Sequence, residues 1–393
     1  MRHQRSPQRL ALGSVLSLVL ALAACGGGGG DTPPAVQPAQ QAVLPAVTQT
    51  LNLNTLPNIS GTSTTARVEV PISLHRTSAG DTFFTVPITV GNTTLQAILD
   101  TGSPGLRVLP GTLQEGDRTL TSTVSQVAFA GGESLTGVTA QAVVKVGDAS
   151  TGSAIDFTLA DTVGCVDTQP DCNARDAASD PQAYRFLQEA GDSQSGFKAV
   201  LGVSLRNDTV AVDGVFSPLA QIGKSTFIIR WNPTLGTGRL IINPNASDDT
   251  GWAPYGMYAS NDRLPNNLPS WGDHMLSGCL IDHTSRTQQC SYVMLDSGAP
   301  RMTLRNPSVT TPGVAPAGSS LQWVLYQDQQ HATTSPSFSV SPLHGVTGNS
   351  STLVALPPTT LNEPASMVWG TMVFFQYDVM YSQVGGFIAL RSH

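Results

Sequence analysis

Charged residues are scarce in this sequence. They make up 12% of its 393 residues, and three of them are lysines. A helical bundle would need more Glu, Lys and Arg, whereas 38 glycines and 27 prolines beside abundant Thr, Ser and Val favour strands joined by turns. The formal net charge of −7 and the lack of a basic cluster also argue against nucleic-acid binding, which requires a positive surface. We therefore expect an all-β protein that does not bind nucleic acid.

Several motifs of known chemistry are absent as well. The seven histidines are scattered and form no His-Glu-x-x-His segment, so a zinc protease finds no support. No Gly-x-Ser-x-Gly segment occurs, which excludes the commonest serine-hydrolase elbow. No Cys-x-x-Cys spacing indicates a zinc site either. We expect no metal and no other cofactor.

Cysteines are few, and four of the five fall into two local pairs. These are Cys165 with Cys172 and Cys279 with Cys290. Four cysteines permit three connectivities, and local pairing is the simplest. Free or metal-binding thiols are the alternative, but disulfides formed in an oxidising compartment are favoured.

The N-terminus has the pattern of a targeting segment. Three arginines precede an apolar run over residues 10–24 that is too short for a comfortable membrane span and is typical of a signal peptide. It ends in Leu22-Ala23-Ala24-Cys25, which resembles the lipobox of a bacterial lipoprotein. That resemblance implies that Cys25 is lipidated and begins the mature chain. A cleaved secretory signal without a lipid is the alternative. Removing residues 1–24 changes the formal net charge from −7 to −10.

The segment after Cys25 is predicted to be a flexible tether over residues 25–66. It consists of a Gly run and then a Pro-, Gln- and Ala-rich stretch with no Lys or Arg before Arg67. Such a composition cannot bury a core. Gly26 directly after the cysteine resembles an outer-membrane address, so we expect a lipoprotein that faces the periplasm or the exterior.

Short apolar runs alternate with turn residues from Val68 onward. Residues 83–90, a turn at Gly91-Asn92 and residues 95–99 predict a hairpin that leads directly into Asp100. A second hairpin is predicted from residues 124–129 and 137–146, and a short helix near residues 183–190. The aromatic residues between positions 374 and 381 are interpreted as core packing.

Two segments far apart in the chain share one pattern. Ala97-Ile98-Leu99-Asp100-Thr101-Gly102-Ser103 matches Val293-Met294-Leu295-Asp296-Ser297-Gly298-Ala299, and the two aspartates are separated by 196 positions. In each, apolar residues predict a strand that ends in Asp, a small hydroxyl residue and Gly. Asp249-Thr250-Gly251 is a third match, but no apolar strand precedes it. We interpret that one as a turn.

Four segments, in order, resemble elements of the pepsin-like aspartic proteases, and the resemblance covers nearly the whole chain from Arg67. They are residues 81–110 with the first Asp loop, the apolar-apolar-Gly element at 196–202, the strand into the second loop at 290–298, and the second apolar-apolar-Gly element with the strands closing the second lobe at 368–381. The motif Asp-Thr-Gly-Ser-x-Gly-Leu-Arg that begins at Asp100 also resembles that of a group of bacterial lipoproteins related to pepsins.

This resemblance implies a bilobal all-β fold with the cleft between a lobe at residues 67–245 and a lobe at residues 246–393. Asp100 and Asp296 would be the catalytic pair, because two adjacent carboxyls share one proton and can together activate water and polarise a carbonyl. Thr101 and Ser297 would link the two loops beneath them. The remaining predicted loop residues are Gly102 and Gly298, which allow close approach, and Ser103, which would hydrogen bond Asp100.

Three positions depart from the pepsin pattern. Ala299 stands where the first loop has Ser103, so we hypothesise a raised pKa for Asp296 and a pH optimum less acidic than that of pepsin. Arg107 replaces an aromatic residue that supports the flap. Phe129 is the candidate flap residue and lacks the hydroxyl of the usual tyrosine, the alternative being an ordinary strand residue.

We therefore expect an aspartic endopeptidase, monomeric and lipid-anchored in the bacterial envelope, that cleaves extended peptide or protein substrates. The first alternative is a catalytically silent binding lipoprotein on the same scaffold. The second is an adhesin of generic β-sandwich type, in which Asp100 and Asp296 would not meet.

Overall fold

The computed structural model describes residues 66–189, 192, 194–207, 214–223, 225–264, 266–328, 331–341, 350–357 and 365–393. The chain divides into two units, residues 1–37 and 38–393, and every described residue belongs to the second. The expected signal peptide, Cys25 and the tether up to residue 65 lie outside the described residues.

The described residues are almost entirely strands and turns, as the composition predicts. The larger sheet they form has 15 strands and joins both ends of the described chain, because β26 and β27 pair beside β11, β12 and β1. Its order is β13 (Ala253–Gly256), β27 (Phe387–Ser392), β26 (Tyr377–Ser382), β11 (Thr226–Asn232), β12 (Thr237–Ile242), β1 (Val68–Arg76), β2 (Thr82–Val90), β3 (Thr93–Asp100), β10 (Ala199–Val203), β4 (Pro104–Val108), β9 (Ile155–Cys165), β6 (Glu133–Ala142) and β5 (Thr119–Ala128), with β7 (Val144–Val146) and β8 (Ala149–Ser150) beside β2.

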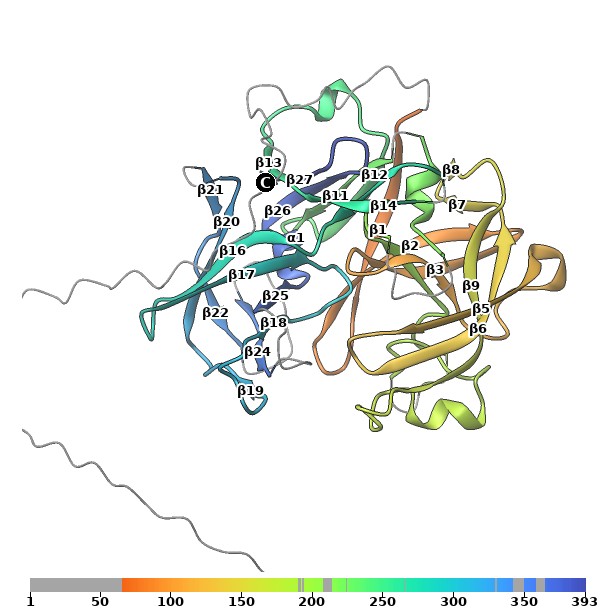
Figure 1. The fold of residues 1–393 in the computed structure, drawn as a ribbon, viewed down its shortest axis with the longest axis horizontal. Coiled ribbons are helices and arrows are strands. Elements are labelled where there is room, and N and C mark those ends of the chain that lie inside the picture. The colour runs from red at the N-terminus through yellow and green to blue at the C-terminus, as the bar shows by residue number, and fades with distance from the viewer. Residues whose placement is uncertain are drawn as a thin grey trace, which may run out of the picture. The chain divides into compact units, whose positions relative to one another are not determined.

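A second sheet, of 10 strands within the described ranges, is built from residues 276–369 (Figure 1). Its order is β19 (Gly313–Val314), β24 (Leu353–Leu356), β18 (Met302–Arg305), β25 (Ser366–Trp369), β17 (Thr287–Leu295), β16 (Leu276–Asp282), β20 (Ser320–Tyr326), β22 (Phe338–Val340) and β23 (Ser350–Ser351), with β21 (Ala332–Thr334) against β20. A separate pair joins β14 (Tyr258–Arg263) to β15 (Pro269–Gly272).

Helices are short wherever the structure describes the chain. They are α1 (Met372–Gln376) and the 3-10 helices η1 (Glu115–Asp117), η2 (Arg175–Ser179), η3 (Pro218–Gln221) and η4 (Ala246–Asp248). None of the helices in these ranges has the length and apolar character needed to cross a membrane.

Both hairpins predicted in the first half are confirmed. β2 and β3 pair around Gly91, whose φ of 59° suits a tight turn that glycine tolerates best. β5 and β6 pair around the turn at residues 129–132, although β6 begins at Glu133 rather than near 137.

The short helix predicted near residues 183–190 is wrong over its described part. The chain turns at residues 181–183 and then forms an isolated β-bridge, in which Phe186 exchanges two backbone hydrogen bonds of 2.9 Å with Phe197. Tyr184 and Phe186 are both buried and stand two residues apart, which is the period of a strand rather than of a helix. Leu187, with a φ of 58°, also interrupts helical geometry.

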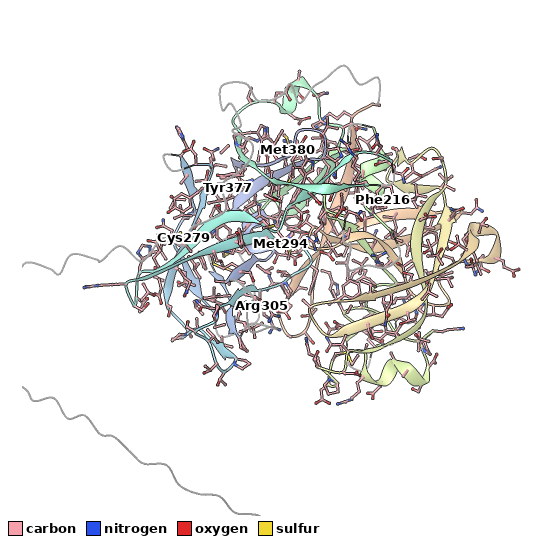
Figure 2. The ribbon with its side chains drawn as sticks, in the orientation of Figure 1. Phe216, Cys279, Met294, Arg305, Tyr377 and Met380 are labelled. Carbon is pink, nitrogen blue, oxygen red and sulfur yellow. A yellow bond between two sulfur atoms is a disulfide. The ribbon has the colours of Figure 1, made fainter. Side chains whose placement is uncertain are left out.

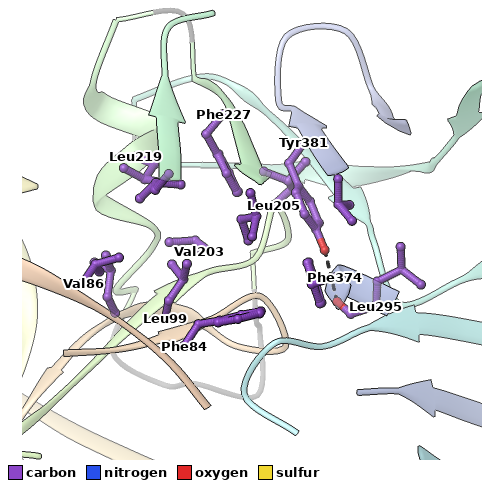
Figure 3. Close-up of a cluster of buried hydrophobic side chains, with 14 of the residues drawn as sticks. Phe84, Val86, Leu99, Val203, Leu205, Leu219, Phe227, Leu295, Phe374 and Tyr381 are labelled. Carbon is purple, nitrogen blue, oxygen red and sulfur yellow. Dashed lines mark hydrogen bonds between the residues drawn. The ribbon is translucent and has the colours of Figure 1, made fainter. Parts of the chain in front are cut away.

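One continuous core joins residues of both halves of the chain. Phe84 of β2 packs against Trp231 of β11 and Phe374 of α1, with ring centroids 5.2 Å and 6.1 Å apart. Figure 3 shows Phe374 and Tyr381 in the same buried cluster as Leu99 and Leu295, the last apolar residues before each aspartate. The interpretation of the 374–381 aromatics as core is confirmed, since Phe374 is 0% exposed and Tyr381 1%.

Candidate active site

Each Asp-containing loop is held by the same arrangement of three strands. β3 ends at Asp100, β10 pairs with it in parallel register and β4 returns antiparallel to β10. In the second half, β17 leads to Asp296, β25 pairs with it in parallel register and β18 returns antiparallel to β25. The apolar-apolar-Gly segments supply β10 and β25, which brace the two loops from behind.

Glycine at the end of each bracing strand permits this close approach. A Cβ on Gly202 would lie 2.6 Å from the Ser103 carbonyl oxygen, and one on Gly370 would lie 2.6 Å from that of Arg301. Real side chains do not tolerate such contacts with backbone. The two glycines therefore allow the backbone that follows each aspartate to pack directly against the bracing strand.

The structure brings Asp100 and Asp296 together. Each carboxyl group lies against the glycine of the opposite loop, and the two are close enough that each shifts the pKa of the other. A Cβ on Gly298 would stand 2.5 Å from Asp100 Oδ1, and one on Gly102 would overlap the Asp296 carboxyl. Asp100 is 7% exposed and Asp296 is partly exposed.

Thr101 and Ser297 connect the loops beneath the carboxyl pair. Thr101 Oγ1 donates to the Leu295 carbonyl at 2.8 Å and accepts from the Ser297 N–H at 2.9 Å. Ser297 Oγ reciprocates, donating to the Leu99 carbonyl at 2.7 Å and accepting from the Thr101 N–H at 3.1 Å. Both side chains are essentially inaccessible to solvent. Each loop therefore gives the other the same two hydrogen bonds, and these four bonds fix the position of one loop relative to the other.

The two aspartates differ in the donors that reach them. Asp100 accepts from the Gly102 N–H at 2.7 Å and from Ser103 Oγ at 2.5 Å. Asp296 accepts the equivalent backbone bond from Gly298 at 2.8 Å, but Ala299 offers no hydroxyl. Donors of this kind stabilise the ionised form of a carboxyl.

This difference assigns the shared proton. Burial and the adjacent charge of Asp100 raise the pKa of Asp296 well above its usual range. Burial also raises the pKa of Asp100, but the hydrogen bonds from Ser103 and Gly102 oppose that effect. The pair titrates as a unit, and the proton that remains after the first ionisation resides on Asp296.

Ala299→Ser is expected to move the upper pH limit of activity to lower pH. A hydroxyl at position 299 could donate to Asp296 as Ser103 does to Asp100, and it would favour the ionised form and lower the pKa of Asp296. The shared proton would then be lost at lower pH. A pH profile of kcat/KM, with the exposed Ala332→Ser as control, measures the shift. An upper limb that stays in place or moves to higher pH would contradict this assignment.

The third Asp-Thr-Gly segment takes no part in this site. Asp249 follows η4 in a bend, and no strand leads into it. Its neighbour Asp248 is 2% exposed and accepts from Arg67 Nε at 2.8 Å, so that carboxylate belongs to a structural ion pair.

The candidate flap residue lies at the tip of the β5–β6 hairpin. Phe129 packs edge-on against Phe186 with ring centroids 5.6 Å apart, beside a cluster of buried apolar residues.

Both predicted disulfides are present. Cys165–Cys172 lies next to the tip of the β5–β6 hairpin, where Glu133 pairs with Cys165. Cys279–Cys290 crosslinks β16 and β17.

Arg107 is a buried residue of β4. It is 1% exposed, and its Nη1 donates to Thr158 Oγ1 of β9 at 2.6 Å, which in turn lies 2.7 Å from Ser125 Oγ of β5. The position that carries an aromatic residue in pepsins therefore contacts the hairpin through a chain of polar groups.

Arg206 and Asp273 were not singled out by sequence. Arg206 Nη2 donates to the Gly102 carbonyl inside the first loop, and its Nη1 bonds Asp273 Oδ1 at 2.9 Å. A charged residue four positions after Gly202, the end of the apolar-apolar-Gly element, was the available signal. Its partner lies 67 residues away and has no motif of its own.

Other hollows and clusters add nothing to the site. A cavity of about 260 Å³ in the first half is lined by Pro110, Leu113, Arg118, Asp161 and their neighbours, and neither aspartate loop reaches it. Within the described residues, no group of three or more His, Cys, Asp or Glu is placed to hold a metal ion.

Comparison with solved structures identifies the fold of the chain. No protein-family model matches the chain, and no curated protein matches it. Among solved structures, it is similar to the aspartic proteinase from Irpex lacteus, with 14% identity, a TM-score of 0.52, and coverage of 83% of this chain and 97% of that one. The protein therefore has the bilobal fold of the pepsin-like aspartic proteinases.

Proposed function

We propose that the protein is an aspartic endopeptidase whose catalytic pair is Asp100 and Asp296. The observation that carries the proposal is that each carboxyl lies against the glycine of the opposite loop, with four hydrogen bonds of Thr101 and Ser297 holding the two loops together beneath them. Two carboxyls packed this closely share a proton, because both cannot easily be ionised at once. The ionised group is then a base and the protonated group an acid in one site. The asymmetry of their donors supports fixed roles for the two groups.

In the proposed mechanism, ionised Asp100 accepts a proton from a water molecule as the water oxygen attacks the scissile carbonyl carbon. Protonated Asp296 donates its proton to the carbonyl oxygen, and a neutral gem-diol results. Asp296 then takes back a proton from one hydroxyl of the diol, Asp100 protonates the amide nitrogen and the C–N bond breaks. The products are a carboxylic acid and an amine, and the pair again holds one proton. No covalent intermediate and no cofactor are needed.

The proposal is tested by peptide cleavage with the purified full chain. A mixture of unstructured peptides is incubated between about pH 3 and pH 7, and new termini are read by mass spectrometry. A statine-type inhibitor, which carries a hydroxyl in place of the attacked carbonyl, should abolish the cleavage. Cleavage that resists the inhibitor would contradict the proposal. If the inhibitor binds but no peptide is cut, the catalytically silent binding protein is supported instead.

We also propose that a lipid on Cys25 anchors a monomeric protein in the bacterial envelope, with the domain held away from the membrane by the tether. Cys25→Ala should move the protein from the detergent phase to the aqueous phase in a detergent phase-partition experiment, because acyl chains dominate membrane affinity. Mass spectrometry of the wild-type N-terminus supplies the control. Unchanged partition and an unmodified Cys25 would contradict the anchor.

A further inference from the structure

The guanidinium of Arg206 lies between the first aspartate loop and the strand that enters the second. Arg206 follows β10, the strand that braces the first loop, and its side chain is 17% exposed. It donates to the Gly102 carbonyl, and its Nη1 lies 3.6 Å from the sulfur of Met294, two residues before Asp296. Figure 2 labels Met294 on β17. One side chain therefore contacts the first loop and the strand that enters the second.

The other side of this guanidinium is fixed by a buried carboxylate. Asp273, 2% exposed, bonds Arg206 Nη1 at 2.9 Å. The same carboxylate accepts from Ser204 Oγ and from the Leu205 N–H, both at 2.7 Å. Three donors therefore reach the Asp273 carboxylate. This fixed carboxylate holds the flexible Arg206 side chain in one orientation.

The carbonyl that Arg206 binds stands at a sensitive point of the first loop. The Gly102 N–H on one side and the Ser103 hydroxyl on the other are the two donors to Asp100. A hydrogen bond to the carbonyl between them constrains the orientation of both. Through this hydrogen bond Arg206 acts on the loop that carries Asp100.

The second loop has a different residue at the matching position. Arg206 stands four residues after Gly202, and four residues after Gly370 stands Phe374, which is 0% exposed. The hydrogen bond from a guanidinium to a loop carbonyl is therefore found at the first loop, as is the serine hydroxyl that donates to the aspartate.

We propose that Arg206, held by Asp273, is a positioning residue that sets the Asp100 loop and its charge state for catalysis. This inference rests on the proposed peptidase function. Asp273 pairs directly with Arg206, and the charge of Arg206 acts on Asp100 and Asp296. Two further titratable groups belong to this region: the half-exposed His274, whose Nδ1 lies 4.0 Å from Asp273 Oδ1, and the buried phenol of Tyr381, which donates to the Leu295 carbonyl at 3.2 Å. The positive charge of Arg206 acts to lower the pKa of both loop aspartates.

Arg206→Met tests the inference by two independent measurements. Loss of the charge should raise the pKa of both aspartates, so both limbs of the pH profile of kcat/KM should move to higher pH. The misplaced loop should reduce kcat/KM at the optimum by about 10-fold to 100-fold. Carbon-13 NMR titration of the Asp100 and Asp296 carboxyls, assigned with the two Asp→Asn variants, should show the same displacement without any need for turnover.

Matched variants separate positioning from general stabilisation. Arg206→Lys keeps the charge but not the planar fork, so it should lower kcat with limbs near those of wild type. Arg305→Met removes another partly buried arginine that donates to a backbone carbonyl, that of Pro357, and should leave both readouts unchanged. If Arg206→Met does not fold because Asp273 is left unpaired, the double variant with Asp273→Asn replaces it.

The outcomes distinguish the two proposals. Unchanged pH limbs and unchanged carboxyl titration in Arg206→Met, with only a lower Tm, would overturn the positioning role while the peptidase function stands. If the wild-type protein cleaves no peptide, the proposed function fails, and the NMR titration alone decides whether Arg206 sets the charge of Asp100.

Discussion

Gly298→Ala is expected to slow peptide cleavage by about 100-fold or more although both aspartates remain in place. The added Cβ would stand 2.5 Å from Asp100 Oδ1, a separation that real Cβ atoms essentially never show. The backbone at Gly298 does not have a positive φ, so alanine fits the local conformation and the damage comes from the opposing carboxyl alone. The loops must move apart, and a displacement near 1 Å costs about 100-fold or more in rate.

The measurement is kcat/KM on a cleaved peptide, with circular dichroism to confirm folding. Gly313→Ala is the matched control, because a Cβ there meets nothing within 4 Å and the backbone again lacks a positive φ. It should retain wild-type activity. The expectation fails if Gly298→Ala cleaves as fast as Gly313→Ala, since the two loops would then not be in contact during catalysis.

The sequence was sufficient to predict the loops because their chemistry is local. An apolar strand, Asp, a hydroxyl residue and Gly recur around Asp100 and Asp296, and the structure gives both copies the same bracing strands. The third Asp-Thr-Gly lacked the strand and lies in a bend, as expected. The local cysteine pairs were predictable for the same reason, because the simplest pairing joined near neighbours.

Features that depend on how distant segments meet could not be predicted. Arg206 and Asp273 carry no motif, and only the fold brings the second against the first. Arg107 was recognised as a departure, but its polar chain to Ser125 depends on the register of β4, β9 and β5. The prediction of a helix near residues 183–190 was wrong because Tyr184 and Phe186 are both buried in an apolar cluster that the local sequence does not reveal.

Asp100→Asn is expected to reduce peptide cleavage by about 10⁴-fold, the scale seen when a residue of a catalytic unit is removed. Asparagine keeps the size of the side chain but cannot take a proton from water. Folding should be retained, since the substitution also removes a charge buried beside Asp296. Asp296→Asn should lose activity to a similar degree, because the amide cannot return a proton to the reacting carbonyl.

The central claim, that Asp100 and Asp296 together hydrolyse peptide bonds, is tested most directly by one comparison. Initial rates of cleavage of one peptide are measured for the wild-type protein, Asp100→Asn and Asp249→Asn, the last being the same substitution in the Asp-Thr-Gly that lies outside the pair. We predict that Asp249→Asn matches wild type while Asp100→Asn is slower by about 10⁴-fold. Cleavage by Asp100→Asn at the wild-type rate would contradict the assignment of the pair.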